Sequence, residues 1–306
     1  MAEHSQHPMD HFPVRPLRFP LAADQPVAVV WSRTKPAFSV FLNALAMHVP
    51  HFERYLVASL RRAREQIRDP ALKRDVTAII GQEANHSHNL TAFNQHLRAR
   101  YPEAVAIDDA SIAWFARHAA EDDLKASVGF TAGYETFTFL AGMIILQHHD
   151  RWFADADPQM KALWVWHQVE EIEHGAVAFE VWQHLFGEHE WTRKWMVLKA
   201  ALHIARETVL LYPRMARREG WLRSPWQAVK TLAFGGEMLG RLFLAALPVF
   251  SRRYHPRRHP IATTAQNPIQ IAWRRYEASG GDVLAIDHAK LAAMLRMAPP
   301  AGSPTG

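Results

Sequence analysis

The chain has 306 residues, of which 49% are hydrophobic and 21% are charged, and its formal charge is +5. This is the composition of a globular protein with a sizeable core, and so small a charge predicts no nucleic-acid partner. The absence of cysteine excludes disulfides, thiolate metal sites and a thiol nucleophile, so any metal ion would need carboxylate, imidazole or water ligands.

The hydrophobic pattern predicts an all-α protein. Residues 1–36 are proline-rich and are expected to form an extended arm. From residue 37 to 187, apolar residues recur at three- and four-residue spacing, which is typical of helices. Asp69-Pro70 and the stretch 150–158 interrupt this pattern, because proline cannot continue a helix interior.

The rest of the chain is predicted to be helical as well. Tyr101-Pro102 ends a helix, and the segment up to Asp123 is expected to be a long connection with a short helix. Further helices are predicted at 190–218, at 226–250 and near 282–296. The expected organisation is an arm (1–36), a four-helix bundle (37–187), a C-terminal helical extension of the same domain (188–296) and a flexible tail (297–306).

Two Glu-x-x-His pairs are candidate metal ligands: Glu83 with His86, and Glu171 with His174. Residues three apart share one face of a helix, so each pair can direct a carboxylate and an imidazole at one ion. In a chain with 19 histidines, one such pair is expected by chance. The pairs therefore need support from a second pattern.

That second pattern is the spacing of the glutamates from the predicted turns. Glu53 precedes the first break and Glu83 follows it at a similar separation, so both lie roughly 20–24 Å from the turn on antiparallel helices. Glu135 and Glu171 repeat the arrangement around the second break. Four helices would thus bring ligands to one level, as in ferritin-like di-metal proteins with a long crossover between helices two and three.

Each glutamate also has an interpretation without metal. Glu53 closely follows Pro50 and could be a first-turn residue stabilised by the helix dipole. Glu83 could lie on a solvated face. Glu135, in contrast, lies in the apolar segment GYETFTFLAG, where a lone carboxylate is costly, and Trp and Val flank Glu171. The combined pattern favours a buried metal centre.

These motifs resemble a bacterial family labelled predicted metal-dependent hydrolases. The resemblance extends from the run that begins FSVFLNALAMHVPHFERYL, through GYETFTFLAG, to the YHP after the apolar helix, and its most specific parts are QEANH and EEIEH. Leu90 stands where a further histidine often occurs in the family. The resemblance implies metal-ligand roles for Glu53, Glu83, His86, Glu135, Glu171 and His174.

The ligand set predicts two metal ions, with iron favoured and manganese or zinc as alternatives. The main expectation is a di-iron enzyme that activates dioxygen to hydroxylate, desaturate or cleave a small hydrophobic or lipid-like substrate, with an unidentified electron donor. The first alternative is a dinuclear hydrolase of an ester or phosphate. The second is a ferroxidase or a metal-storage protein. The word hydrolase in the family label is itself a prediction, so it does not decide among them.

The expected catalytic residues surround the predicted centre. Glu135 and Glu171 are candidates for bridging or shifting carboxylates. Thr138, with Thr131, could line an oxygen-side pocket, or its hydroxyl could bond back to the helix. His167 lies one heptad before His174 and is a candidate for a role behind the ligands or on the substrate side.

The C-terminal region suggests a location. An apolar helix at 226–250 is followed by a basic collar, which predicts peripheral membrane contact through 226–258. The alternative is a helix packed on the bundle with a solvated basic loop. We see no signal-peptide pattern and no uninterrupted apolar run of ~18–20 residues, so we expect a cytoplasmic protein, peripheral to the inner membrane face if it binds lipid, with a homodimer as a candidate assembly. The collar consists of Arg252, Arg253, Arg257 and Arg258.

Overall fold

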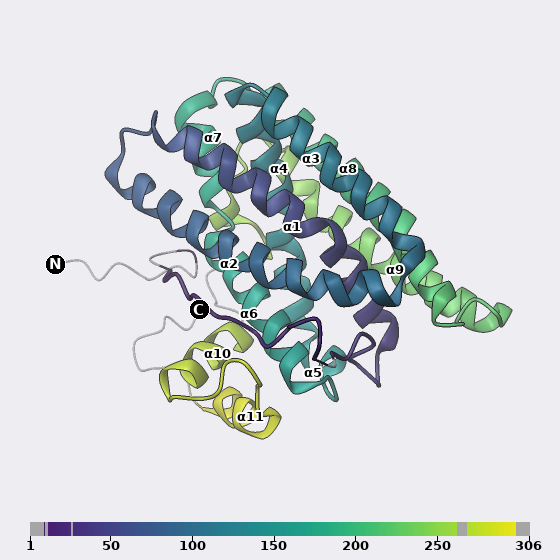
Figure 1. The fold of residues 1–306 in the computed structure, drawn as a ribbon. Helices are drawn as coiled ribbons and strands as arrows, with labels where there is room; N and C mark the ends of the chain where they lie inside the picture. The colour runs from purple at the N-terminus through teal and green to yellow at the C-terminus, as the bar shows by residue number, and fades with distance from the viewer. Residues whose placement is uncertain (1–8, 10–11, 26, 262–267, 298–306) are drawn as a thin grey trace.

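The structure is a computed structural model that describes residues 9, 12–25, 27–261 and 268–297 (Figure 1). Across these residues the regular structure is helical and no strand occurs. The prediction of an all-α protein is therefore confirmed. Most of the predicted tail lies outside the described residues.

The helices are numbered in chain order, with short 3-10 helices labelled η. They are α1 (Pro36–Arg64), α2 (Pro70–Arg100), η1 (Pro102–Ala104), α3 (Val105–Glu121), α4 (Leu124–Gln147), α5 (His149–Trp152), α6 (Pro158–His174), α7 (Val177–Phe186), α8 (Glu190–Arg218), α9 (Pro225–Ala246), η2 (Leu247–Phe250), η3 (Pro256–Arg258), α10 (Pro268–Ala278) and α11 (His288–Arg296).

Both predicted breaks appear, and both end with an Asp-Pro pair that starts a helix. The carboxylate of Asp69 accepts hydrogen bonds from the first backbone N–H groups of α2, and Asp157 does the same for α6. The following proline needs no hydrogen bond at the first helical position. Pro50, however, lies inside α1, which begins at Pro36 and continues to Arg64. Glu53 is therefore a mid-helix residue, and its interpretation as a first-turn glutamate is wrong.

The structure corrects three predicted elements. The connection after α2 contains the 17-residue helix α3 rather than a short helix. Few apolar side chains of α3 are buried, so its hydrophobic pattern is weak. Helix α10 was not predicted, and the last helix covers only His288–Arg296 of the predicted 282–296.

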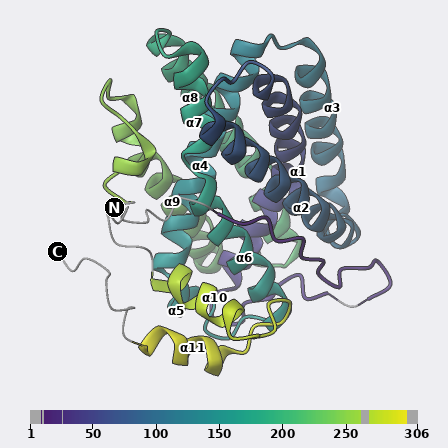
Figure 2. The ribbon, with the colours of Figure 1, turned by 90° about the vertical axis from the view of Figure 1, so that its left-hand side faces the viewer.

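Four helices, α1, α2, α4 and α6, pack against one another around the core. Helix α8 lies on α1 and α4, α9 lies on α4 and α8, and α3 covers α1 (Figure 2). The N-terminal arm runs across α2 and α6, where the ring of Phe19 packs on Trp166 and its backbone N–H donates to Asn89. The chain thus covers the four central helices from several sides.

Two described helical segments are long and apolar enough to cross a membrane by length and composition. In α4, 89% of the apolar window is buried, so α4 is explained as a core helix. In Pro225–Phe250, which comprises α9 and η2, only 33% of the window is buried. The second segment packs one face on the fold and exposes the other.

Helix α4 and helix α8 approach closely at Gly133. A Cβ atom at this position would lie 2.8 Å from the carbonyl oxygen of Met196 and 3.0 Å from Cα of Val197, both in the backbone of α8. Only glycine allows this approach without moving one helix. Gly240, in α9, has no atom within 4 Å of a Cβ built on it.

We predict that Gly133→Ala lowers the free energy of unfolding by about 1–3 kcal/mol, because the backbone of α8 must move to accommodate the methyl group. Gly240→Ala, the matched control, should be neutral or stabilising by up to about 1 kcal/mol, because alanine favours a helix. Urea unfolding followed by circular dichroism measures both. Equal effects at the two positions would contradict the close crossing.

Candidate metal centre

The six predicted ligands lie together in the interior, where the four central helices meet. Glu53 comes from α1, Glu135 from α4, and the two Glu-x-x-His pairs from α2 and α6. His167, from α6, joins them. None of the seven residues is more than 4% exposed.

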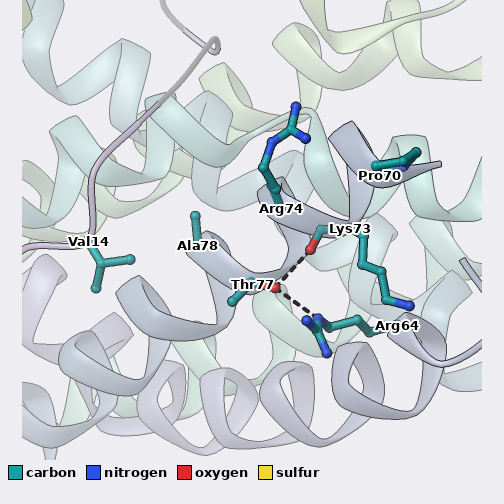
Figure 3. A pocket seen from close by; sticks show the side chains of 7 residues that line it. All are labelled: Val14, Arg64, Pro70, Lys73, Arg74, Thr77 and Ala78. Carbon is teal, nitrogen blue, oxygen red and sulfur yellow. Dashed lines mark hydrogen bonds between the residues drawn. The ribbon is translucent and has the colours of Figure 1, made fainter.

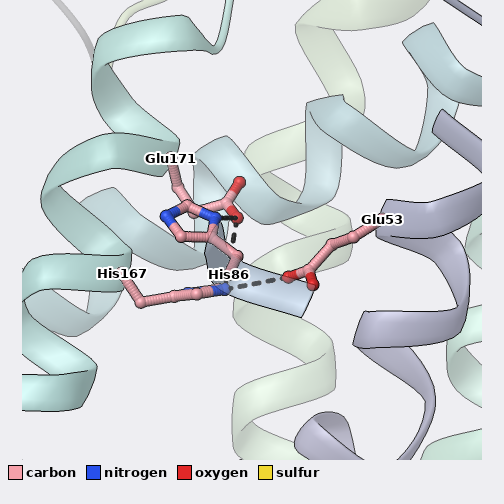
Figure 4. A group of neighbouring side chains, drawn as sticks. All are labelled: Glu53, His86, His167 and Glu171. Carbon is pink, nitrogen blue, oxygen red and sulfur yellow. Dashed lines mark hydrogen bonds and ion pairs between the residues drawn. The ribbon is translucent and has the colours of Figure 1, made fainter. Parts of the chain in front are cut away.

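These residues form two groups that share one carboxylate. The first group is Glu53, His86, His167 and Glu171, whose side chains point toward one another in Figure 4. In each group, one ligand atom per residue lies within 4.8 Å of the others. The shared residue is Glu171, which therefore lies between two potential ion positions. The second group is Glu83, Glu135, Glu171 and His174.

Imidazole nitrogens face carboxylate oxygens throughout the centre. Nε2 of His174 lies 2.8 Å from Glu83, 3.3 Å from Glu135 and 3.3 Å from Glu171. Nε2 of His167 lies 3.2 Å from Glu53 and 3.5 Å from Glu171. Each nitrogen is thus directed at the space that the carboxylates surround.

Several buried atoms of the centre lack a hydrogen-bond partner. Oε2 of Glu53, Oε2 of Glu83 and Nδ1 of His86 have no hydrogen-bond partner. Oε1 of Glu83 and Oε2 of Glu135 make no hydrogen bond either and meet only the ring nitrogen of His174. Buried polar atoms without partners are costly, and metal coordination would supply the partners. Carboxylate oxygens with a few imidazoles suit iron, manganese or zinc. The residues present therefore fit two divalent ions.

Without metal ions, the interactions between the buried carboxylates and histidines determine which of these groups carry protons. Burial raises the pKa of Glu135 to about 8. Burial opposes the charged form of His174, but the surrounding Glu83, Glu135 and Glu171 raise its pKa well above the ordinary value. For His86 the carboxylates of Glu170 and Glu83 likewise outweigh burial and raise the pKa. The centre therefore holds protons at neutral pH that metal ions would have to displace.

Each histidine is oriented by a second polar contact on its other ring nitrogen. Nε2 of His86 lies 3.0 Å from Glu170, and Nδ1 of His174 lies 2.9 Å from the amide oxygen of Gln82. Nδ1 of His167 lies 2.9 Å from the amide of its neighbour Gln168. Such contacts fix the ring, and at His86 and His174, where the outer nitrogen faces an oxygen acceptor, they leave the inward nitrogen free for an ion, as in known metal sites. At His167 the Gln168 amide donates to Nδ1, so in the neutral ring Nε2 carries the proton and faces Glu53.

A buried arginine from the N-terminal arm supports this outer layer. Arg15, which is 6% exposed, donates to Glu170 at 3.0 Å and to Glu173 at 2.8 Å. Arg274 of α10 donates to Glu173 as well, and Arg15 also reaches Glu277 of the same helix. The arm and α10 thus meet behind α6, and Arg15 contacts His86 through Glu170.

The sequence did not reveal this outer layer. The acidic run at 170–173 was a usable signal, because three glutamates within four successive positions of one turn cannot all face a central ion. Those facing away from it, when buried, need cations of their own, and arginine is the usual choice. Arg15 and Arg274, however, lie far away in the chain.

The remaining predicted residues lie beside the centre. The hydroxyl of Thr138 donates to the carbonyl oxygen of Glu135 at 3.2 Å and lies 3.4 Å from its Oε1. Thr131 is buried, and its hydroxyl has no hydrogen-bond partner. Leu90 is also buried, among apolar side chains.

Two surface grooves lie along α2, and none of the candidate ligands lines either one. The first, of about 590 Å³, has a basic rim formed by Arg64, Lys73 and Arg74 (Figure 3). The second, of about 600 Å³, lies between α1 and α2 and includes Arg54, which donates to Ser87. The grooves therefore add no residue to the centre itself.

The chain belongs to a family described as predicted metal-dependent hydrolases, because the family model matches residues 13–260. The match covers Arg15, every candidate ligand and helices α1 to α9. It confirms the resemblance found in the sequence. No curated protein and no solved structure matches the chain.

We predict that metal binding releases protons and stabilises the fold. Zinc or manganese added to chelator-treated protein should raise the melting temperature, since the ions compensate buried charge. Calorimetric titration in two buffers of different ionisation enthalpy should give net proton release near neutral pH. Affinity should fall as the pH decreases, because protons compete for His86, His174 and Glu135. Net proton uptake would contradict the assignment.

Arg15→Ala should weaken metal binding by about 10–100-fold, the effect typical of losing an outer partner of a ligand. Arg18→Ala is the matched control, because Arg18 lies on the same arm but is exposed and bonds Asn85 instead. Competition with a chelator measures the metal affinity. The melting temperatures of the metal-free variants show whether a substitution also destabilises the fold. Equal affinities for the two variants would refute a positioning role for Arg15.

Proposed function

We propose that the chain is a metal-dependent hydrolase with a dinuclear centre held by Glu53, Glu83, His86, Glu135, Glu171 and His174, with His167 as a seventh candidate ligand. The observation that carries this proposal is the pair of buried ligand groups sharing Glu171. Membership of the predicted metal-dependent hydrolase family supports the reaction class.

The proposal includes a ferritin-like arrangement of α1, α2, α4 and α6. Each of these helices contributes at least one ligand, and the four contact one another. The segment between α2 and α4, which contains α3, would be the long crossover of such a bundle. On this view α8 and α9 extend the same domain, as the sequence predicts.

Two divalent ions would supply Lewis-acid polarisation of the substrate and a water activated as nucleophile at neutral pH. Glu171 is the candidate bridging residue, because it belongs to both groups. Glu135 is the candidate shifting carboxylate, and the hydroxyl of Thr138, which reaches its Oε1, would steady it. The outer contacts of the three histidines would keep their rings in place during turnover.

The surroundings of the centre favour an apolar substrate. The ring of Trp166 lies 4.8 Å from that of His86, and Trp164 lies 5.6 Å from His167. On the other side, Phe12 of the N-terminal arm packs edge-on against His174. An ester with a hydrophobic acyl or alcohol part would fit these walls better than a highly charged phosphate.

A second candidate function is oxidation of a hydrophobic substrate by a di-iron form of the same centre. The observation in its favour is the burial of every candidate ligand, because hydrolysis needs water whereas oxygen chemistry benefits from excluding it. Four carboxylates with imidazoles also suit iron. This reaction would require an external electron donor.

Anaerobic assays separate the two functions. Protein loaded with zinc or manganese should hydrolyse nitrophenyl esters of short and long fatty acids without oxygen. Glu171→Ala should reduce the rate by more than the roughly 10–100-fold that loss of an outer partner costs. Glu237→Gln, on the exposed surface of α9, is the control and should not change the rate.

The opposite pattern would refute the hydrolase. Substrate-dependent oxygen consumption by the iron-loaded protein, with no anaerobic hydrolysis of any ester or phosphate tested, would favour the oxidase. Oxygen consumption with ferrous iron alone would indicate a ferroxidase.

A further inference from the structure

A second feature lies away from the metal centre, on the helical hairpin formed by α8, α9 and η2. Among the described residues, 15 large hydrophobic side chains are exposed, and 12 of them lie from Trp191 to Phe250. Scattered exposed apolar residues are normal on a protein surface, but a concentration in one element marks an interaction site.

On α8, five of these side chains lie along one side of the helix. The exposed residues follow a four-three-four spacing, which keeps them on one side of a helix. The opposite side of α8 packs on α4 and α1. The stripe consists of Trp191, Trp195, Leu198, Leu202 and Val209, with exposures between 39% and 75%.

Helix α9 carries a parallel stripe. Trp226, Val229 and Leu232 are exposed at its start, Phe243 is exposed near its end, and Leu247 continues the stripe in η2. Between them lie Gly236 and Gly240, and no atom lies within 4 Å of a Cβ built on either. No described part of the chain covers this side of α9.

Helices α8 and α9 are antiparallel neighbours, so their stripes run in opposite directions. Near the turn between the helices, the hydroxyl of Tyr212 donates to the carbonyl oxygen of Thr231 at 2.8 Å. At the other end, Arg193 donates to the carbonyl oxygen of Val249 at 2.8 Å. The turn itself projects beyond the rest of the fold at the lower right of Figure 1.

The hairpin and the segment that follows it are strongly basic, in contrast to the rest of the protein. Residues 188–258 contain 14 Lys and Arg against 5 Asp and Glu, a net charge of +9. The whole chain has a charge of +5, so the remaining residues together carry −4. Exposed arginines gather at both ends of the hairpin: Arg217, Arg218 and Arg223 near the turn, and Arg252, Arg253 and Arg258 beyond η2.

Lysines also accompany the exposed tryptophans. The ammonium of Lys194 lies 5.1 Å from the ring centre of Trp191, and that of Lys230 lies 5.0 Å from the ring centre of Trp226. A tryptophan beside a lysine is suited to the interface between lipid tails and headgroups, where the ring is half-buried and the cation meets a phosphate.

We propose that this hairpin docks on an anionic lipid bilayer. The apolar stripes would enter the headgroup layer, and the arginines at both ends would bind acidic headgroups. Helix α8 has 29 residues and carries charged side chains along its whole length. Such a helix is suited to lie on the bilayer surface rather than to cross the bilayer. The prediction of membrane contact at 226–258 is thereby extended to α8.

Charge complementarity favours lipid over a second copy of the chain. In a symmetric dimer formed through this surface, the same basic hairpin would face itself, and like charges would repel. An anionic bilayer offers the opposite charge together with an apolar layer. One member of the predicted collar does not take part: Arg257 donates to Glu180 at 2.7 Å.

Co-sedimentation of the full chain with vesicles tests the proposal. Vesicles of phosphatidylcholine and phosphatidylglycerol in equal parts should bind the protein at low salt, and vesicles of phosphatidylcholine alone should bind it much more weakly. Arg252→Gln with Arg253→Gln should weaken binding about fivefold for each arginine lost. Trp195→Ser with Leu202→Ser should weaken it through the apolar stripe.

Ile112→Ser is the matched control, because Ile112 is 41% exposed on α3, outside the hairpin. It should bind like the unmodified protein. All variants replace exposed side chains, and circular dichroism checks that they fold. Tryptophan fluorescence quenched by brominated lipid should report insertion of the stripe.

Three outcomes would overturn the proposal. The first is absence of binding to anionic vesicles at low salt. The second is equal binding to neutral and anionic vesicles. The third is a doubled mass in light scattering that Trp195→Ser with Leu202→Ser returns to a monomer, since this would assign the surface to a second copy of the chain.

Discussion

The structure depends on positive charge that compensates the negative charge of four carboxylates buried in one place. Each of the four central helices contributes one of them: Glu53 from α1, Glu83 from α2, Glu135 from α4 and Glu171 from α6. All four residues are almost completely buried. Burying one unpaired carboxylate already costs several kcal/mol, so four together require nearby positive charge. Histidines supply part of it as protons in the metal-free state, and the orphaned oxygens indicate where cations would supply the rest.

This requirement organises the chain well beyond the centre. Once His86 is oriented by Glu170, that carboxylate needs a cation of its own, and Arg15 provides it from the N-terminal arm. Glu173, which lies behind the same helix, is shared by Arg15 and Arg274. Ion pairs in successive layers therefore connect the N-terminal arm and α10 to α6, and the arm forms part of the surroundings of the site.

The sequence revealed the inner layer because helices have a fixed rise and a fixed repeat. Similar distances of Glu53 and Glu83 from an Asp-Pro turn predict a similar height on antiparallel helices, without knowledge of any contact. The outer layer has no such local rule. Arg15 and Glu173 are 158 positions apart, and only the packing of the arm brings them together. The full length of helix α3 was not predicted for a related reason: the helix buries too few apolar side chains to show a periodic pattern.

Helix α4 connects the candidate metal centre to the proposed docking hairpin. Glu135 lies on its inner side, while Gly133, two positions earlier, meets the backbone of α8. Because packed interiors transmit displacement rather than absorb it, the hairpin and the ligand helix must behave largely as one rigid unit. A surface that docks on lipid would therefore hold the centre at a fixed height above the bilayer. If the chain is the proposed enzyme, docking would bring the apolar side chains around its candidate ligands close to a source of apolar substrate.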